Sequence, residues 1–201
     1  MAAKAAAKGA SDTRQRLLDV AVTLFGQHSF AGTSLQMIAD EMGITKAAVY
    51  HHFRTRDDLL TALVEPIMVE LRLIIEQAEE KRTPHARAEY LLVRYAELSV
   101  RHRDLIAIGV IDRGVIEILR DRPKWWGLIR RQVALLTAVQ PGLPGHLNAT
   151  MVLAGLATAA GRSPLDDEGP VVQVDDEVLT RHLIDVGRRI LGLRAPRRPH
   201  A

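Results

Sequence analysis

Residues 33–53 read TSLQMIADEMGITKAAVYHHF, and this stretch decides the fold. Thr33 and Gln36 have the spacing of a capping box, in which each side chain satisfies a free backbone donor at the start of a helix. Apolar residues then recur at helical spacing, and Gly43 can take the left-handed conformation that ends a helix. The stretch therefore predicts a helix that begins at Thr33 and ends at Gly43.

A second short helix is predicted directly after a tight turn. Thr45 is placed to cap it, and we expect it to run from Lys46 to Phe53. Val49 and Phe53 are four residues apart, so they share one face and can hold this helix against the first. Two helices joined in this way form a helix-turn-helix unit, although a surface helical hairpin with no role in DNA binding has the same spacing.

The opposite face of the second helix carries residue types that suit DNA recognition. Lys46, Ala47, Tyr50 and His51 form one stripe, since successive helical residues are rotated by about 100°. Alanine permits close approach to base edges, whereas lysine and tyrosine can reach guanine acceptors or phosphates. The stripe predicts a recognition helix in the major groove of double-stranded DNA.

The segment from about Asp12 to Leu60 resembles the DNA-binding domain of the TetR family of bacterial transcriptional regulators. The run TSLQMIADEMGITKAAVYHHFRTRDDLL carries the resemblance, with its Tyr-x-x-Phe pair and its acidic-leucine ending. The chain departs from the family at His51, where an aromatic residue is frequent, and at Ser29, where glycine is usual. Ending the first helix at Ser29 or His28 without glycine costs on the order of 1 kcal/mol.

The resemblance implies a role for each residue of this segment and a two-fold homodimer that reads a palindromic operator. The residues expected to hold phosphates are Thr33, Ser34, Tyr50, His52 and Arg56. The residues expected to face the bases are Gln36, Thr45, Lys46, Ala47 and His51.

Composition and charge narrow the class of protein. The chain has 201 residues, enough to bury a sizeable core, and its net charge of +3 supports a polyanionic partner only weakly. It contains no cysteine, which excludes disulfides and thiolate metal sites and fits a reducing compartment. Because no apolar run reaches membrane-spanning length and the N-terminus lacks a signal-peptide core, we expect a cytoplasmic protein with no membrane partner.

The remaining residues predict helices only, because no segment keeps the period-two alternation of a strand. The predicted class is all-α, with an N-terminal three-helix DNA-binding domain and a C-terminal helical domain for ligand binding and dimerisation. Pro66 lies inside the long helix that Thr55 caps and predicts a kink there. The expected parts are a disordered basic arm (1–10), the helix-turn-helix domain (11–57), the effector-binding and dimerisation domain (58–193) and a basic tail (194–201).

Prolines, glycines and apolar runs predict the helices of the C-terminal domain. The resemblance implies that the last two helices pair with their copies in a second subunit, whereas the residues alone also allow burial within one chain. The helices expected after the one that Thr55 caps are 84–101, 103–121, 123–139, 146–162 and 175–193.

The resemblance also implies a small-molecule pocket in the C-terminal domain, whose occupation changes the spacing of the DNA-reading heads. Asp112 and Arg113 are its polar candidates, although such neighbours more often form a structural ion pair. Few other polar groups occur in these helices, so a largely apolar effector is expected. The apolar candidates for the lining are Met68, Tyr95, Ile108, Trp125, Trp126 and Met151.

The resemblance thus implies a repressor that a small-molecule effector releases from DNA, and two other classes of function are alternatives to it. An enzyme is disfavoured because there is no nucleophile motif or Gly-rich phosphate loop, and the adjacent His51 and His52 diverge on a helix. We therefore expect no catalysis, no cofactor and no metal. A DNA-organising protein that takes no effector stays open, and a solid C-terminal core would favour it.

Overall fold

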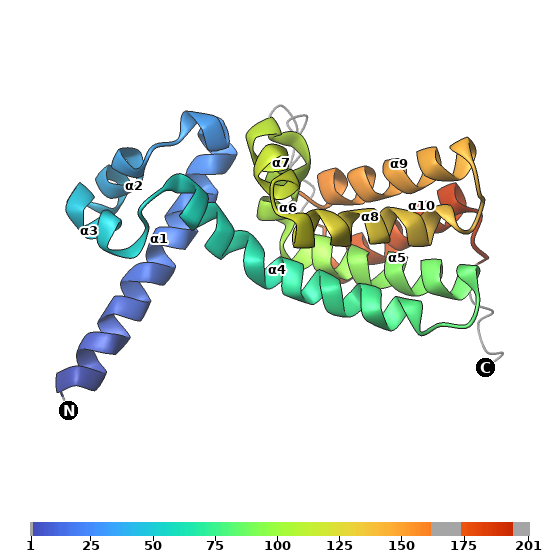
Figure 1. Ribbon diagram of the computed structural model, residues 1–201, viewed down its shortest axis with the longest axis horizontal. Coiled ribbons are helices and arrows are strands. Elements are labelled where there is room, and N and C mark those ends of the chain that lie inside the picture. The colour runs from blue at the N-terminus through green and yellow to red at the C-terminus, as the bar shows by residue number, and fades with distance from the viewer. Residues whose placement is uncertain (1, 162–173, 195–201) are drawn as a thin grey trace.

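The computed structural model describes residues 2–161 and 174–194, and every regular element in these ranges is an α-helix (Figure 1). The predicted all-α class is confirmed. Residues 195–201 of the predicted basic tail lie outside the described ranges. The helices are α1 (Ala2–Gly32), α2 (Leu35–Met42), α3 (Lys46–His52), α4 (Arg56–Glu79), α5 (Pro84–Arg101), α6 (Arg103–Ile111), α7 (Arg113–Arg120), α8 (Pro123–Thr137), α9 (Leu143–Ala160) and α10 (Asp176–Leu191).

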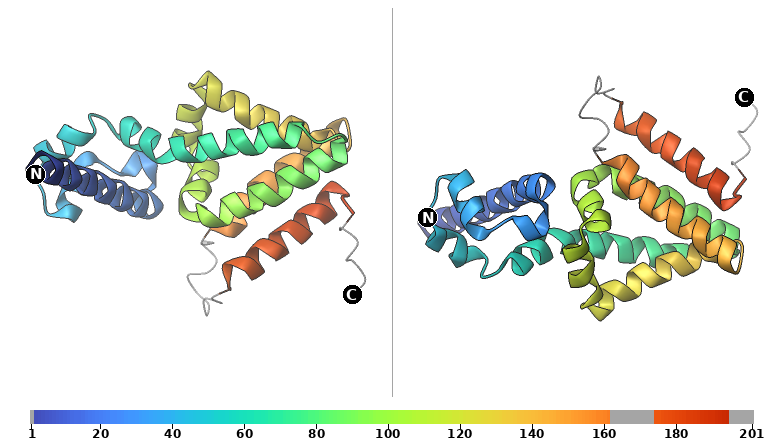
Figure 2. Two further views of the ribbon diagram at one scale, coloured as in Figure 1. Left: turned by 90° about the horizontal axis from the view of Figure 1, so that it is seen from below. Right: turned by 90° about the horizontal axis from the view of Figure 1, so that it is seen from above.

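The helices form two parts that α4 joins (Figures 1 and 2). α1, α2 and α3 pack together at one end of the molecule. At the other end most of α4 packs with α5 and α8, and α5 in turn packs with α9 and α10. α6 and α7 lie between the two parts and both contact α1, so they are the elements that connect the bundle to the three-helix unit.

α1 differs from the prediction at both of its ends. It begins at Ala2, whereas the sequence predicts a disordered arm over 1–10 and a helix start at Asp12. The reason is that alanine has the highest helix propensity, and the AAKAAAK run allows the helix to extend outward from its buried part. Near its other end Ser29 interrupts the helix with φ 64° and ψ 166°.

α4 starts as predicted and continues through its proline. The Thr55 hydroxyl accepts from the Asp58 amide, and the Asp58 carboxylate accepts from the Thr55 amide, which completes a capping box. The helix then runs to Glu79 with Pro66 inside it. Its first turn contains residues 57 and 58, so the predicted domain boundary falls within a continuous helix.

The predicted helix 103–121 is two helices. Asp112 separates α6 from α7 with an extended backbone, and its Oδ1 accepts from the amides of Gly114 and Val115. A short carboxylate side chain that caps a new helix competes with continuation of the old one, which is why the apolar run does not stay regular. α9 also begins earlier than predicted, at Leu143, because Pro144 is tolerated in the first turn of a helix.

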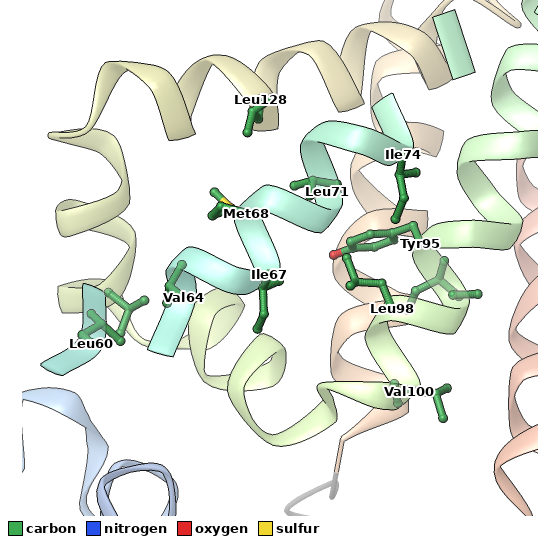
Figure 3. Packing of buried hydrophobic residues seen from close by; sticks show 14 of the residues in the cluster. Leu60, Val64, Ile67, Met68, Leu71, Ile74, Tyr95, Leu98, Val100 and Leu128 are labelled. Carbon is green, nitrogen blue, oxygen red and sulfur yellow. The ribbon is translucent and has the colours of Figure 1, made fainter. Parts of the chain in front are cut away.

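Side chains of α4 form the centre of the C-terminal core (Figure 3). Met68 and Leu71 point toward Leu128 of α8, and Ile74 lies over the ring of Tyr95 on α5. All five are buried, and burying a side chain of this size stabilises the fold by about 1.5–3 kcal/mol. In the described part of the chain, no helix is both long enough and apolar enough to cross a membrane.

Candidate nucleic-acid interface

The first helix of the helix-turn-helix unit starts one residue later than the sequence predicts. Ser34, not Thr33, is the N-cap of α2, and its hydroxyl accepts from the Met37 amide at 3.1 Å. The Gln36 amide donates to Asp40 at 2.7 Å and does not reach back to the cap. The predicted capping box is therefore wrong, although the helix that it predicted is present.

Thr33 has an internal role that the sequence does not reveal. Its side chain is buried, and its hydroxyl lies 3.1 Å from the Leu24 carbonyl and 2.8 Å from the Ser29 carbonyl. It ties the start of α2 to the end of α1. The hydroxyl that was predicted to hold a phosphate is thus engaged inside the domain.

The turn and the second helix form as predicted. Gly43 has φ 65°, and its amide donates to the Ala39 and Asp40 carbonyls at the end of α2. Thr45 caps α3 by accepting from the Ala48 amide. The predicted contact face is buried, since Val49 has no exposed surface and Phe53 is 4% exposed. These contacts fix the angle at which the other face of α3 is presented.

The predicted stripe of α3 is on the surface. Lys46, Ala47, Tyr50 and His51 are all exposed, and 46% of Tyr50 is accessible. The Lys46 ammonium lies 5.7 Å from the centre of the Tyr50 ring, close enough for a weak cation–π contact. The structure thus brings a cation, an aromatic hydroxyl and a small side chain together on one exposed face.

The other predicted DNA contacts of this region differ in their exposure. Ser34, Gln36 and Thr45 are exposed at the starts of α2 and α3. His52 is half-buried, with its ring 5.4 Å from that of His51 and at 77° to it. The two imidazoles therefore lie edge to face and do not diverge as the sequence predicts.

Arg56 does not present its guanidinium in the predicted way. Its Nη1 lies 2.9 Å from the Phe30 carbonyl and 2.8 Å from those of Ala31 and Thr33. The guanidinium also lies over the Phe30 ring, 5.1 Å from its centre. Arg56 therefore has an internal role that the sequence did not predict, because its Nη1 holds the segment between α1 and α2 against the start of α4.

Arg54 is the cation that the site prediction omits. It lies between α3 and α4 and is exposed, and among the described residues it pairs with no carboxylate. The sequence feature that could have identified Arg54 is its position immediately after the Tyr-x-x-Phe pair. Only Thr55 separates it from Arg56, and the two arginines differ in burial and in the hydrogen bonds that Arg56 makes.

The predicted effector site is only partly assembled. Met68 and Tyr95 lie in the core, and Ile108 is half-buried at its edge. Trp125 and Trp126 are half-buried, and each ring lies under an arginine guanidinium, at 4.7 and 5.3 Å respectively.

Three of the predicted effector contacts point elsewhere. Asp112 Oδ2 accepts from the Phe30 amide at 2.7 Å, so this carboxylate links the two parts of the molecule. The Arg113 side chain is 93% exposed beside Glu117, because position 113 lies on the outer face of α7. Met151 is 61% exposed on the outer face of α9. The structure therefore does not bring these three side chains together with Met68 and Tyr95.

The grooves on the described surface lie away from the predicted lining. One runs between α5 and α10 and includes Val100, Thr180 and Ile184. The other lies at the end of the bundle beside His85 and Leu193. Of the predicted lining, Met68 and Tyr95 are buried in the core, and neither of these two grooves includes them.

The sequence of the N-terminal part matches known proteins. The family described as "Bacterial regulatory proteins, tetR family" matches residues 17–63. The HTH-type transcriptional regulator AcrR of Shigella flexneri is 45% identical over 56 residues, which are 28% of this chain and 26% of that protein. The HTH-type transcriptional repressor KstR2 of Rhodococcus jostii is 32% identical over 78 residues, 37% of this chain and 38% of that protein. The chain thus matches well under half the length of these relatives.

Solved structures match the fold over most of the chain. The ketosteroid transcriptional regulator KstR2 of Mycobacterium tuberculosis superimposes with a TM-score of 0.64 at 18% identity, covering 90% of this chain and 93% of that one. AibR, solved with isovaleryl coenzyme A and operator DNA, superimposes with a TM-score of 0.58 at 17% identity, covering 86% and 96%. Residues 17–63 thus match the TetR family of bacterial regulatory proteins, and the chain as a whole shares its fold with these solved structures.

Proposed function

We propose that this protein is a sequence-specific DNA-binding transcriptional regulator, acting in the cytoplasm as a repressor that a small-molecule effector releases. The observation that carries the proposal is the exposed stripe of α3, where Lys46, Ala47, Tyr50 and His51 stand on a helix fixed by buried Val49. A helix so fixed can enter the major groove without rearranging its own packing. The match of residues 17–63 to the TetR family supports the same reading.

Within this proposal the DNA contacts fall into two groups. Arg56 and Thr33 are left out as DNA contacts, because both are used to hold the domain together. The proposed base-facing residues are Gln36, Thr45, Lys46, Ala47 and His51. The proposed phosphate contacts are Ser34, Tyr50, His52 and Arg54.

A homodimer is proposed because one recognition helix reads only a few base pairs. Leu143, Leu147 and Met151 follow one another at four-residue spacing on α9 and are 70%, 51% and 61% exposed. Val178 and Val186 of α10 are 36% and 51% exposed. Covering such apolar positions with a second copy would remove them from water and place two recognition helices about 34 Å apart, or a multiple of this, on a palindrome.

Release by an effector is proposed from the family and from two solved relatives. One relative is described as a ketosteroid regulator, and the other was solved with isovaleryl coenzyme A and operator DNA. For this chain we assign DNA binding to 11–57 and effector binding with dimerisation to 58–193. The effector must prefer a conformation that does not bind DNA, because only such a preference shifts the population.

An effector-independent DNA-organising protein is the second candidate. The observation in its favour is that Met68, Tyr95 and Leu71 belong to a closed core and that neither groove reaches them. The two candidates differ in sequence preference, since an organiser binds most DNA sequences with similar affinity.

The deciding experiment is selection of bound fragments from the source genome by the purified protein, followed by affinity measurements at several salt concentrations. A regulator gives a short palindrome bound at nanomolar concentration with a steep salt slope. Lys46→Ala is expected to lose about 1–3 kcal/mol of binding free energy for this palindrome. Lys124→Ala, an exposed lysine of α8, is the matched control and should bind as wild type. Weak binding to every sequence would instead support the organiser.

A further inference from the structure

The backbone between α1 and α2 is held in a conformation that it would not keep by itself. Ser29 has φ 64° and ψ 166°, and among the described residues it is the one residue other than glycine with a positive φ. Such a conformation is disfavoured by about 5- to 150-fold, so it persists only where neighbouring contacts hold it. The contacts at this junction therefore fix how α2 leaves α1.

Two side chains from distant parts of the sequence hold the peptide groups that follow Ser29. Arg56, in the first turn of α4, donates from Nη1 to the Phe30 carbonyl at 2.9 Å and to the Ala31 carbonyl at 2.8 Å. Asp112, at the break between α6 and α7, accepts from the Phe30 amide through Oδ2 at 2.7 Å. Both backbone polar groups of Phe30 are thus bound, one by each side chain.

These two contacts connect the junction to different parts of the molecule. Arg56 lies three residues after Phe53, so it moves with the helix-turn-helix unit. Asp112 belongs to the C-terminal part, where α6 packs on α9 and α7 packs on α8. Its other oxygen, Oδ1, accepts from two amides in the first turn of α7, so the carboxylate is fixed to the start of that helix. Through Asp112 the position of α7 therefore determines that of the Phe30 amide.

The Phe30 side chain has little room to move independently of α7. It is 5% exposed, and its ring meets the Phe25 ring edge to face with the centroids 5.2 Å apart. The Arg56 guanidinium lies 5.1 Å from its centre. A Cβ on Gly114, in the first turn of α7, would lie 3.3 Å from its Cδ1. Because a close-packed interior transmits a displacement, a shift of α7 moves Phe30.

A shift of Phe30 reaches the recognition helix over a short path. The Ser29 carbonyl accepts from the Thr33 hydroxyl at 2.8 Å, and Thr33 lies directly before Ser34, the N-cap of α2. α2 in turn packs against α3. The direction in which α3 faces DNA therefore depends on the hydrogen bond between Asp112 and Phe30.

We propose that Asp112 is a positioning residue for DNA binding, whose bond to the Phe30 amide fixes the half-site spacing that the dimer accepts. This inference rests on the proposed homodimeric regulator. Two recognition helices bind one palindrome only when their separation matches the distance between its halves. Without the bond, Ser29 is free to relax, and each DNA-binding part takes a range of orientations relative to the bundle. The dimer then loses affinity for its own spacing and tolerates other spacings.

The same bond gives the proposed effector a way to act at a distance. An effector that displaces the break between α6 and α7 away from α1 removes the acceptor of the Phe30 amide. It thereby favours a conformation that matches the palindrome poorly, and this preference is what release from DNA requires.

The test uses the full-length protein and three DNA duplexes: the palindrome that it selects, and two versions whose centre is one base pair longer or shorter. One base pair changes the separation of the halves by about 3.4 Å and turns one half by about 35° relative to the other. We expect wild type to bind the selected palindrome about tenfold more tightly than either altered version.

Asp112→Ser separates the proposed role from the cap of α7. Serine is a good N-cap, but its single hydroxyl cannot both cap α7 and accept from the Phe30 amide. We expect Asp112→Ser to be more stable than Asp112→Ala, with the Phe30 amide exchanging equally fast in both. Its affinities for the three duplexes should lie within about threefold of one another, with the selected palindrome bound about tenfold more weakly than by wild type. Arg113→Ser, at the neighbouring exposed side chain, is the matched control and should behave as wild type.

The outcomes distinguish positioning from a merely structural role. An equal loss of affinity for all three duplexes in Asp112→Ser would overturn the inference, as would an Asp112→Ser protein that keeps the wild-type preference. A wild type that binds all three duplexes equally would overturn this inference alone. Failure of wild type to bind any palindrome would contradict the proposed function, and this inference with it.

Discussion

Ser29 is the residue with the greatest backbone strain in the described part of the chain. Its φ of 64° and ψ of 166° fall in a region that residues other than glycine rarely occupy, at a cost of about 1–3 kcal/mol. The Thr33 hydroxyl donates to its carbonyl and the Arg56 guanidinium holds the segment that follows, so the surrounding contacts maintain the conformation. The strained backbone therefore lies at the junction between α1 and α2.

We expect Ser29→Gly to raise the free energy of unfolding by about 1 kcal/mol, because glycine adopts this conformation without a steric penalty. The gain is measured by denaturant unfolding. Ala31→Gly, two residues further on, removes a good helix former and should lower stability in the same assay. A Ser29→Gly protein less stable than wild type would show that the serine hydroxyl matters more than the strain.

Tyr95 gives the core a predictable dependence on pH. Its folded pKa is raised to about 12 by burial, whereas an exposed tyrosine titrates near 10. The stabilisation is complete below pH 10 and is lost as pH rises toward 12, because the unfolded chain releases the proton first. Wild type should lose on the order of 2–3 kcal/mol across this range relative to Tyr95→Phe. Tyr50→Phe, at a half-exposed position, should follow wild type.

At the level of elements, Asp112 connects three helices. One carboxylate oxygen caps α7, and the other accepts from the Phe30 amide of α1, 82 residues away. Gly114 fits closely here, since a Cβ on it would lie 3.3 Å from the Phe30 ring. The break between α6 and α7 is thus also the contact between the bundle and the DNA-binding part.

Asp112→Ala should lower the free energy of unfolding by about 1–2 kcal/mol through loss of the cap. It should also speed hydrogen exchange of the Phe30 amide, since that amide loses its acceptor. The adjacent Arg113→Ala, at a side chain that is 93% exposed, is expected to change stability by less than about 0.5 kcal/mol. Unchanged exchange at Phe30 in Asp112→Ala would contradict the link between the two parts.

For the whole molecule, the proposed dimer can be tested by comparing substitutions at two leucines of similar exposure. Leu147 on α9 is 51% exposed, and Leu73 on α4 is 46% exposed. Leu147→Glu would bury an unpaired charge in the proposed interface, so we expect a monomer by sedimentation and at least a hundredfold loss of operator affinity. Leu73→Glu should remain dimeric. Dimeric Leu147→Glu would exclude this face of α9 as the interface.

Sequence was most reliable where a residue and its partner are close along the chain. Thr45 caps α3 through the amide of Ala48, and Gly43 ends α2 through carbonyls three and four residues earlier. The spacing of Val49 and Phe53 identified the buried face of the recognition helix for the same reason. Helical geometry fixes these relations locally, so the fold class and the exposed stripe were both predictable.

The tertiary structure alone decided the roles of residues whose partners are distant in sequence. Thr33, Arg56 and Asp112 are ordinary polar residues, and these partners lie 9, 23 and 82 residues away respectively. Hydrogen-bonding capacity is a property of the side chain, but burial and the available partner depend on how helices pack. The sequence by itself therefore determined an all-helical protein with an exposed polar stripe on α3. Packing determined which cations remain exposed and which polar groups are left unpaired in the core.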